Sequence, residues 1–490
     1  MLIYNTQTHR KEELKPIEEG KIRMYVCGPT VYDQIHIGNA RTFLSFDVIR
    51  RYLQYKGYEV TFAQNLTDVD DKIINRANEE GRTAAEVAEE FSNAFIEQMH
   101  RFGIKDPDIR PRATHEIEAM QQMIQILLDK GHAYVASNGD VYFSVRSDTH
   151  YGVLSGRNLD QLRAGERVEV NEDKHDPFDF ALWKAAKPGE PSWPSPWGDG
   201  RPGWHTECCA MIHRYLGTPI DIHGGGQDLV FPHHENETAQ AMCAWDKALA
   251  NVWMHTGMLR VNGEKMSKSL GNFLTLKDVL DKYPADAVRL LMLQTHYRSA
   301  LDFQTNQLES SVGTLERLKT CVKNLRWAAA NAPQDGELCD ADRAFGKAVD
   351  DAREEFVAQM DDDFNTSGAL AAIFTLVTAA NKYLADAKDD ISTAVSLRGA
   401  DTLTELADVL GIDLSAGEDE LPHELVDLAK QYAGYEGDSA SDAAEALLAA
   451  RQEARKAKNW GTADAIRDGI TGLGLVLEDT AAGARLRRAN

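Results

Sequence analysis

The chain opens with two different hydrophobic periods. Residues 22–27 alternate apolar and polar side chains as a strand does, and Gly28 and Pro29 end the run. Apolar residues then recur every three or four positions from 39 to 55, which is typical of a helix. Residues 59–66 again have a strand pattern. The order strand, helix, strand predicts the start of an α/β sheet, with a ligand site where the strands end.

The middle of the chain interrupts this rhythm. Helical spacing covers residues 68–130, and short strand patterns with a Pro-, Trp- and Gly-rich stretch fill residues 131–200. Because Trp193 and Trp197 need packing partners, this stretch is predicted to be a structured insertion in the sheet domain rather than a linker. A strand pattern that ends in glycines returns at residues 217–226.

Residues 290–410 have a helical pattern. The longest uncharged run, residues 364–381, is interrupted by Asn, Thr, Ser and Gly and is too polar for a membrane span, so it is predicted to be a buried bundle helix. An acidic stretch at residues 414–424 joins this bundle to a small terminal domain. There, residues 451–470 predict a basic helical segment and residues 474–488 predict a hairpin.

Composition and charge narrow the class of protein. A chain of 490 residues with 43% hydrophobic and 27% charged residues is typical of a soluble globular protein of about three or four domains. The first residues have no apolar core, so no secretory signal is predicted and a cytoplasmic location is expected. The net charge of −24 argues against binding nucleic acid by bulk attraction. Residues 451–490 nevertheless carry +3 behind an acidic block of −20 at residues 331–450, which permits a local contact with a polyanion.

Six cysteines are spread along the chain, and none forms a CxxC pair. A disulfide framework is not expected, and any metal site must assemble from distant segments. The stretch FPHHENE at residues 231–237 is a candidate part of such a site. Pro232 suits the first position of a helix in which His233 and Glu237 share one face, with glycines 224–226 in the loop before it. A solvated helix start would have the same composition, so this stretch alone leaves both interpretations open.

Two further strings favour phosphate chemistry. HIGN at residues 36–39 follows the first strand at the start of a helix, where backbone amides bind phosphate, although an ordinary turn would look the same. KMSKSLGN at residues 265–272 places two lysines three positions apart, as a clamp for a developing pyrophosphate would. The alternative is an ordinary basic loop that binds no ligand. Together the two strings resemble the paired signatures of class I aminoacyl-tRNA synthetases, with Asn39 in place of the final His of the usual HIGH.

Four longer strings narrow this resemblance: CGPTVYDQIHIGNARTF, NLTDVDDKI, GWHTECCAM and HGGGQDLVFPHHENE. They resemble the cysteinyl-tRNA synthetase family over essentially the whole chain, most strongly in residues 20–75 and 200–275 and more loosely in 330–440. The resemblance implies an α/β fold with a split Rossmann-like nucleotide-binding domain and an inserted domain, followed by an α-helical bundle and a small C-terminal anticodon-binding domain. The implied segments are catalytic halves at 1–120 and 200–255, an inserted domain at 121–199, a stem-contact region with the KMSKS loop at 256–320, the bundle at 321–415 and the terminal domain at 420–490.

The resemblance also implies one zinc ion per chain, with Cys27, Cys208, His233 and Glu237 as its ligands. Two thiolates and an imidazole suit zinc, and a carboxylate completes the set. Cys209 is expected to be a buried neighbour, and His234 and Glu235, which are not implied as ligands, are expected to face solvent at the helix start. Zinc lowers the pKa of a thiol and binds the thiolate, whereas a serine hydroxyl stays protonated, so the metal would separate cysteine from serine.

The implied reaction joins cysteine to AMP from Mg²⁺-bound ATP and then transfers it to the 3′ end of tRNA(Cys). The implied catalytic residues are His36, Asn39, Lys265 and Lys268. The implied ATP site comprises His36, Gly38, Asn39, Gly224, Gly225, Gly226, Gln227 and Lys268. The substrate cysteine would contact Thr67, Trp204, His205 and Asp228. The implied tRNA contacts are Arg451, Arg455, Lys456, Lys458, Trp460 and Arg467, although a lone Trp on a basic helix is more often part of a core. The expected partners are therefore tRNA(Cys), L-cysteine and ATP, with no membrane, for a monomeric protein.

Three other functions stay open at this point. An enzyme that joins the cysteinyl adenylate to an aminosugar should lack the basic terminal domain. A zinc-bearing RNA-binding protein without catalysis would have no reason to keep both HIGN and KMSKS. A nucleotidyltransferase that makes a coenzyme would be shorter and would have no thiolate zinc site.

Overall fold

The computed structural model describes residues 1–159, 173–266, 272–332, 337–387, 390–414, 421–480 and 483–488. Contacts divide the chain into two units. The first comprises residues 1–315, 355–372 and 409–412, and the second comprises residues 316–354, 373–408 and 413–490. The described candidates for metal, phosphate and cysteine binding all lie in the first unit.

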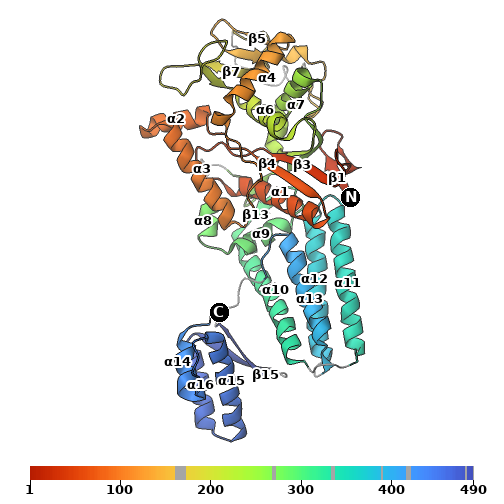
Figure 1. Cartoon of the computed structure of the whole chain (residues 1–490), viewed down its shortest axis with the longest axis vertical. Helices are drawn as coiled ribbons and strands as arrows, with labels where there is room; N and C mark the ends of the chain where they lie inside the picture. Colours follow the sequence, from red (N-terminus) through yellow and green to blue (C-terminus); the bar gives the residue numbers. More distant parts are fainter. Residues whose placement is uncertain are drawn as a thin grey trace. The chain divides into compact units, whose positions relative to one another are not determined.

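A four-stranded parallel sheet forms the centre of the first unit, in the order β10 (Ala250–Thr256), β9 (Ile220–Gly226), β3 (Lys21–Val26) and β4 (Glu59–Gln64). Met24 of β3 lies in register between Phe62 of β4 and Ile222 of β9. All three side chains are buried, as expected for parallel strands that are covered on both faces. Two distant segments of sequence thus build one sheet, which confirms the predicted split α/β domain (Figure 1).

Helix α1 (Ile37–Tyr55) connects β3 to β4 and confirms the helix predicted there. Its start is capped by the HIGN string itself. His36 Nδ1 accepts a hydrogen bond from the Asn39 amide at 3.1 Å, and Asn39 Oδ1 accepts one from the His36 amide at 3.4 Å. This reciprocal pair satisfies two amides that a helix start leaves without partners. Gly57, with a φ of 91°, follows the last turn.

Two further helices and a hairpin belong to the first unit. They are α2 (Asp71–Glu80), α3 (Ala84–Arg101), and the antiparallel pair β1 (Leu2–Asn5) and β2 (Arg10–Glu13). Helix α3 begins with a second capping box, in which Thr83 and Glu86 exchange hydrogen bonds.

The predicted insertion forms a sheet of its own. Between α4 (Ile117–Asp129) and α6 (Trp204–Leu216), four antiparallel strands follow in the order β5 (Ala133–Val135), β6 (Val141–Phe143), β7 (Phe180–Ala185) and β8 (Gly200–Pro202). Trp183 of β7 is buried, and Trp197 contacts it edge-on with ring centres 6.0 Å apart. Trp193 packs against the same apolar cluster. Both tryptophans of the Pro- and Gly-rich stretch therefore have the packing partners that were predicted.

The segments on either side of the KMSKS string lie close to α1. Strand β11 (Leu259–Val261) pairs with β12 (Glu264–Lys265) and with β13 (Leu301–Phe303), and helices α8 (Leu276–Leu280) and α9 (Ala285–Leu293) lie between β12 and β13 in sequence. The Ile37 amide donates to the Leu274 carbonyl at 3.1 Å, and the Leu276 amide donates to the Ile35 carbonyl at 2.9 Å. The chain that leaves the KMSKS string is thus bonded to the start of α1.

Four long helices follow β13: α10 (Thr305–Asn331), α11 (Asp340–Asp361), α12 (Thr366–Ala387) and α13 (Thr393–Val409). They lie side by side in Figure 1. Phe345 stacks on Tyr383 with ring centres 4.6 Å apart, and Arg353 donates to Glu405 at 2.8 Å. Among the helices that the structure describes, α12 is the one that is long and apolar enough to cross a membrane. Its packing in the bundle identifies it as the buried core helix that was predicted.

The end of the chain forms three helices and a hairpin: α14 (Glu424–Ala433), α15 (Ala440–Lys456), α16 (Trp460–Gly472), β14 (Leu475–Thr480) and β15 (Gly483–Arg488). Leu425, Leu447 and Ile466 are fully buried in an apolar cluster that belongs to these elements alone. The predicted terminal hairpin is confirmed.

Candidate active site

Four buried side chains converge beyond the carboxyl end of β3. Cys27 follows β3, Cys208 lies in α6, His233 lies in the turn just before α7 (Glu235–Trp245), and Glu237 lies in the first turn of α7. One ligand atom from each lies within 4.8 Å of the others. Cys27 Sγ is 3.6 Å from both Cys208 Sγ and Glu237 Oε1, and His233 Nε2 is 2.7 Å from Glu237 Oε1. The structure thus brings together all four predicted metal ligands.

The helix that carries two of these ligands begins later than predicted. Residues 230–234 form a π-helical turn in which Phe231 is extended, with φ of −140° and ψ of 131°, and α7 itself begins at Glu235 rather than at Pro232. The glycines 224–226 were predicted both as the end of a strand at 217–226 and as a loop before the helix; they lie in β9, which confirms the strand. An added Cβ at Gly224 would be 2.2 Å from the Phe46 ring, so this strand needs glycine in order to pack against α1.

His234 and Glu235 were expected to face solvent, and this prediction is wrong. Both are fully buried. His234 Nε2 lies 3.3 Å from Cys27 Sγ, and its Nδ1 lies 2.8 Å from His255 Nε2. Glu235 accepts hydrogen bonds from the amides of Gly152 and Ser155 at 2.9 and 2.7 Å. The two adjacent histidines therefore have different buried partners, which a regular helix start from Pro232 would not provide.

A second group of possible ligands shares two residues with the first: Cys27, His223, His234 and Glu237. His223 Nε2 lies 2.7 Å from Glu237 Oε2, so the carboxylate lies between two imidazoles. His223 and His234 were not predicted from the sequence. The strand register, which is known only after folding, places His223 between Tyr25 of β3 and Trp253 of β10.

Burial and neighbouring charges set the protonation of this cluster. Burial opposes ionisation of Glu237, but the imidazoles of His233 and His223 outweigh it and hold the pKa of this carboxyl well below its ordinary value. A hydrogen bond from Cys27 lowers the pKa of Cys208 to about 6, whereas burial raises the pKa of Cys27. Two sulfurs, one imidazole nitrogen and one carboxylate oxygen at this spacing fit a tetrahedral cation such as zinc.

Three of the four predicted cysteine contacts, Thr67, Trp204 and His205, lie beside this cluster. Trp204 stacks on His233 with ring centres 4.1 Å apart, and His205 Nδ1 is 3.0 Å from His233 Nδ1. Thr67 donates to Glu207 Oε2 at 2.6 Å. Glu207 was not predicted, although it stands inside the GWHTECCAM string. It is buried, and its Oε1 has no hydrogen-bond partner within the described ranges.

Asp228 and Gln227 lie at a different place, in the short helical turn η3 (Gln227–Leu229) after β9. Both are exposed. An added Cβ at Gly226 would be 2.5 Å from Asp228 Oδ1, and the Asp228 carboxylate acts electrostatically on His36. These residues therefore face the HIGN side of the sheet end, where the ATP contacts were predicted.

The HIGN string lies at the start of α1, where the phosphate contacts were predicted. Burial lowers the pKa of His36, so its imidazole is neutral at pH 7. Because His36 Nδ1 accepts from the Asn39 amide, the proton of the neutral ring is on Nε2. An added Cβ at Gly38 would be 2.9 Å from the His36 ring and 3.7 Å from Cε of Met266. Lys265 lies in β12, and Lys268 lies outside the described residues.

The predicted tRNA contacts lie where α15 meets α16. Trp460 is 58% exposed in the first turn of α16, so it is not the core residue that a lone tryptophan usually is. Arg455, Lys456 and Lys458 are exposed nearby, and so is Arg467, which pairs with Asp464 and Asp468. Arg451 is only 8% exposed, in the packed face of α15.

Comparison with known proteins accounts for the chain as a whole. The family described as "tRNA synthetases class I (C) catalytic domain" matches residues 13–313. The DALR domain family matches residues 355–415, and the "Cysteinyl-tRNA ligase anticodon binding domain" family matches residues 438–487. The cysteine–tRNA ligase of Symbiobacterium thermophilum is 49% identical over 490 residues, which cover 99% of both chains. The chain belongs to the cysteine–tRNA ligase family.

Another cysteine–tRNA ligase, from Pseudomonas fluorescens, is 48% identical and aligns over 100% of both chains. More distant class I structures have the same fold. The Mycobacterium tuberculosis methionyl-tRNA synthetase with methionyl-adenylate superposes with a TM-score of 0.61 at 18% identity, covering 80% of this chain and 89% of its own. A LeuRS–tRNA–LeuAMS complex from Agrobacterium radiobacter K84 gives 0.59 at 13% identity, covering 83% and 88%. The fold is therefore that of class I synthetases, and the sequence relatives identify the cysteine–tRNA ligases within the class.

Proposed function

We propose that this chain is a cysteine–tRNA ligase that makes cysteinyl adenylate from L-cysteine and ATP and then transfers the cysteinyl group to the 3′ end of tRNA(Cys). The observation that carries the proposal is the buried group of Cys27, Cys208, His233 and Glu237, with ligand atoms within 4.8 Å of one another beside the HIGN helix. A soft ligand set of this kind matches a thiol substrate. We expect the enzyme to act as a cytoplasmic monomer.

Zinc would be held by Cys27, Cys208, His233 and Glu237, one ion per chain. When bound there, zinc lowers the pKa of a substrate thiol and binds the thiolate, which a serine hydroxyl cannot match. His223 holds the second oxygen of Glu237 at 2.7 Å and fixes the direction of the first. Trp204, stacked on His233, covers the approach to this site together with His205.

The phosphates of Mg²⁺-bound ATP would lie at the start of α1. The proton on His36 Nε2 is free to donate to a phosphate oxygen, because Nδ1 already accepts from the Asn39 amide. Asn39 uses its Oδ1 in the same cap, which leaves its amide NH₂ to donate. Gly38 permits the close approach of a phosphate. Lys265 and Lys268 would supply the positive charge for the leaving pyrophosphate, and Gly224, Gly225, Gly226 and Gln227 would contact the adenosine.

The substrate's α-carboxylate and ammonium would be received by Thr67 and Asp228. The Thr67 hydroxyl is oriented by Glu207, to which it donates at 2.6 Å. The Asp228 carboxylate is exposed at the end of β9. These residues bind and orient the reactants, and no side chain acts as a covalent nucleophile. Catalysis then rests on the positioning and stabilisation of charge.

Recognition of tRNA would use the exposed cations at the junction of α15 and α16, namely Arg455, Lys456, Lys458 and Arg467, with Trp460 as a stacking surface for a base. Arg451 was predicted to belong to this set, but its burial favours a role in holding α15.

The decisive experiment measures cysteine-dependent exchange of pyrophosphate into ATP and then charging of tRNA(Cys). We expect exchange with cysteine, little exchange with serine, and charging of tRNA that depends on added ATP. Exchange without charging of tRNA, but with ligation to an aminosugar, would contradict the proposal. Removal of the metal with a chelator should abolish exchange, and zinc should restore it.

A further inference from the structure

Arg41 is a buried cation that has no carboxylate partner among the residues that the structure describes. It lies in α1, five residues after His36, and is 2% exposed. Burial is the sole influence on its guanidinium and lowers its pKa to about 10, because no described acidic group acts on it. A buried charge in this position is costly unless hydrogen bonds compensate for its lost hydration.

Four backbone carbonyls provide that compensation. One terminal nitrogen, Nη1, donates to the carbonyls of Gly257 at 3.0 Å and Met258 at 3.3 Å. The other, Nη2, donates to those of His296 at 3.1 Å and Ser299 at 2.7 Å. Only a guanidinium, with its planar fork of donors, can reach two separate backbone segments in this way.

The first of these segments leads into the KMSKS string. Residues 257–258 connect β10 to β11, and β11 continues through a tight turn to β12, where KMSKS begins. The second segment, residues 296–299, leads into β13, the other neighbour of β11. The two segments lie in direct contact, because an added Cβ at Gly257 would be 2.5 Å from the Ser299 carbonyl oxygen. Arg41 thus binds the entry to the KMSKS string where that entry meets β13.

The exit from the KMSKS string is held to the same helix by other means. The Ile37 amide donates to the Leu274 carbonyl, and the Leu276 amide donates to the Ile35 carbonyl. Backbone hydrogen bonds therefore attach the exit to the HIGN end of α1. The entry is held to α1 by a side chain of the same helix, that of Arg41.

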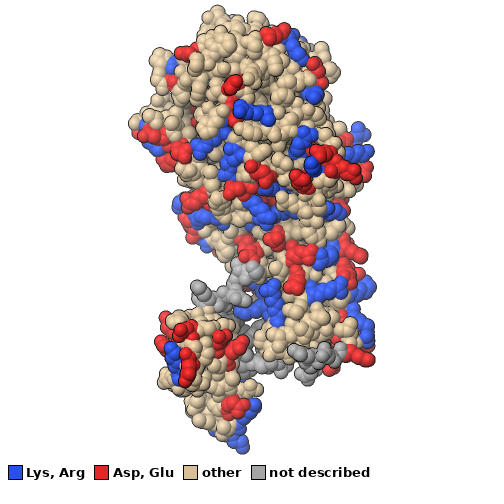
Figure 2. Space-filling model, in the orientation of Figure 1, with Lys and Arg blue, Asp and Glu red and all other residues tan. Residues whose placement is uncertain are grey.

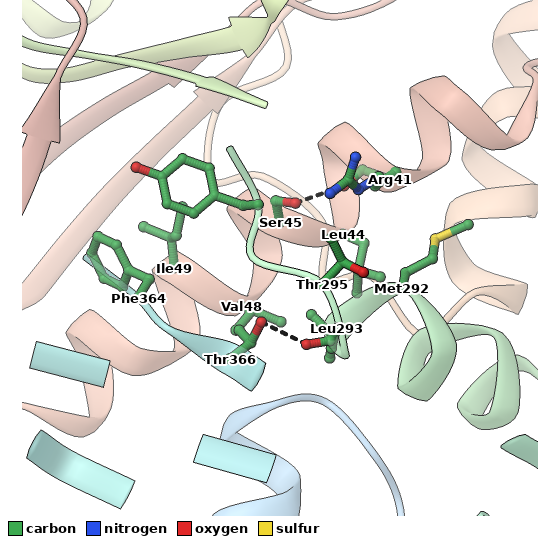
Figure 3. Close-up of a pocket in the computed structure, with 11 residues that line it drawn as sticks. Arg41, Leu44, Ser45, Val48, Ile49, Met292, Leu293, Thr295, Phe364 and Thr366 are labelled. Carbon is green, nitrogen blue, oxygen red and sulfur yellow. Dashed lines mark hydrogen bonds between the residues drawn. The ribbon is translucent and has the colours of Figure 1, made fainter. Parts of the chain in front are cut away.

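A small cavity lies beside Arg41. Leu44 and Val48 of α1, with Leu293, Thr295 and Phe364, line this cavity (Figure 3). The hydrogen bonds of Arg41 supply directional contacts at this place.

We propose that Arg41 is a positioning residue for adenylate formation, which sets the entry to the KMSKS string at a fixed distance from the HIGN string. The inference rests on the proposed function, because it assigns the phosphate chemistry to those two strings. Arg41 does not reach the reactants itself. It acts through the backbone at residues 257–258 and 296–299.

The test compares Arg41→Lys with Arg50→Lys in cysteine-dependent ATP/pyrophosphate exchange. Lysine keeps the charge but cannot serve both segments. We expect Arg41→Lys to lower kcat/KM for ATP at least tenfold and to leave KM for cysteine within twofold, because the cysteine site lies beyond the strand ends. Arg50 is the matched control: it is buried on the same helix and donates to the Asp106 carbonyl at 2.6 Å and to Asp108 at 2.9 Å, away from KMSKS. Arg50→Lys should change both constants less than twofold.

Gly257→Ala tests the same junction in a second way. Its added methyl group separates the two backbone segments without altering Arg41. It should reproduce the loss in kcat/KM for ATP with KM for cysteine unchanged. Rates are measured at least 20 °C below the melting temperature of each variant. The inference is overturned if folded Arg41→Lys exchanges at the wild-type rate, or if Arg41→Lys and Arg50→Lys lose activity equally. Absence of cysteine-dependent exchange in the wild-type protein would instead refute the proposed function.

Discussion

At the scale of single residues, the cap of α1 and the proposed phosphate site share the residues His36 and Asn39. His36 and Asn39 each use one polar atom to cap the helix and keep another for a ligand. A histidine is usual at position 39 in class I signatures. An asparagine can fill both roles because its amide has an acceptor and donors on one short side chain.

The first prediction concerns Asn39. Asn39→Ala should lower kcat for ATP/pyrophosphate exchange about 100-fold, because one donor to the developing phosphate charge is lost. Asn39→His should retain most of the activity. Thr83→Ala is the control, since it breaks the equivalent capping box of α3 and should lower stability by about 1 kcal/mol without affecting exchange. Equal exchange rates for Asn39→Ala and Thr83→Ala would show that Asn39 is only a cap.

The second prediction concerns His223, which touches Glu237 Oε2. His223→Gln should weaken zinc binding about 10- to 100-fold, since the carboxylate loses the partner that orients it. The measurement is competition against a chromogenic chelator, with circular dichroism to verify folding. His213→Gln, in which the lost imidazole stacks on Trp245, should bind zinc as the wild type does. Wild-type affinity in His223→Gln would remove His223 from the site.

The residues of the candidate site fall into two groups, those that could be predicted from the sequence and those that could not. The ligands Cys27, Cys208, His233 and Glu237 could be proposed from the resemblance to a family, and the structure brings them together. His223, His234 and Glu207 could not, because each is recognised only by what surrounds it after folding. A polar residue in a strand or at a helix start can be buried or exposed, and the sequence alone does not decide which.

At the scale of elements, α1 and α9 are joined by a buried ion pair. Asp47 accepts from Arg289 at 2.7 Å and from Arg51 at 2.9 Å, and it also accepts from the Lys105 amide at 3.1 Å. Burial opposes ionisation of Asp47, but the two guanidinium groups outweigh it and lower its pKa. A lowered pKa in the folded state means that the carboxylate stabilises the fold at pH values above its unfolded pKa.

The third prediction follows from that sign. The stabilisation due to Asp47 is complete at neutral pH, and it is lost as the pH falls below the ordinary aspartate value and through the lower folded pKa. Asp47→Asn should lower the free energy of unfolding by about 3 to 5 kcal/mol at pH 7, because Arg289 is left buried without its partner. The difference between variant and wild type in urea titrations should shrink as the pH falls from 5 to 3. A difference that stays constant over this range would contradict the argument. Asp340→Asn, in an exposed pair with Arg343, should leave the midpoint unchanged.

Strands and helices with a clear period were predicted well, and the departures lie at the ends of elements. The strands at β3 and β4, the helix α1 and the terminal hairpin follow directly from spacing. The start of α7 does not, because His233 and His234 contact different partners and the chain adopts a π-helical turn to allow it. The glycines of β9 fit the strand predicted at residues 217–226, and only the loop predicted for them before α7 is wrong, because their packing against Phe46 has no sequence signal.

At the scale of the whole molecule, the chain is acidic, and residues 331–450 carry −20 of this charge. The net charge is −24, and Figure 2 shows acidic and basic side chains interspersed over the face in view. Such a surface gives little general attraction for a polyanion, so recognition of tRNA has to depend on particular contacts. The domain boundaries given by the resemblance stay predictions.

The fourth prediction tests one such contact. Trp460→Ala should raise KM for tRNA(Cys) about 5- to 150-fold, the equivalent of about 1 to 3 kcal/mol of lost stacking, and should leave ATP/pyrophosphate exchange unchanged. Tyr215→Ala, which removes an aromatic side chain that is 40% exposed in α6, is the control and should leave KM for tRNA unchanged. An unchanged KM in Trp460→Ala would exclude stacking by this residue.

The split of the catalytic sheet between two distant segments also determines when the sheet can form during synthesis. Met24 of β3 pairs with Ile222 of β9, so one edge of β3 has no partner until the ribosome has made the strand nearly 200 residues later. At about 5 to 20 residues per second, that interval lasts about 10 to 40 s. During this time one edge of β3 stays unpaired. Cys27 also lacks the three other proposed zinc ligands, Cys208, His233 and Glu237. Nascent chains halted before β9 should therefore bind chaperones but no zinc. Chains halted after α7 should bind less chaperone and more zinc.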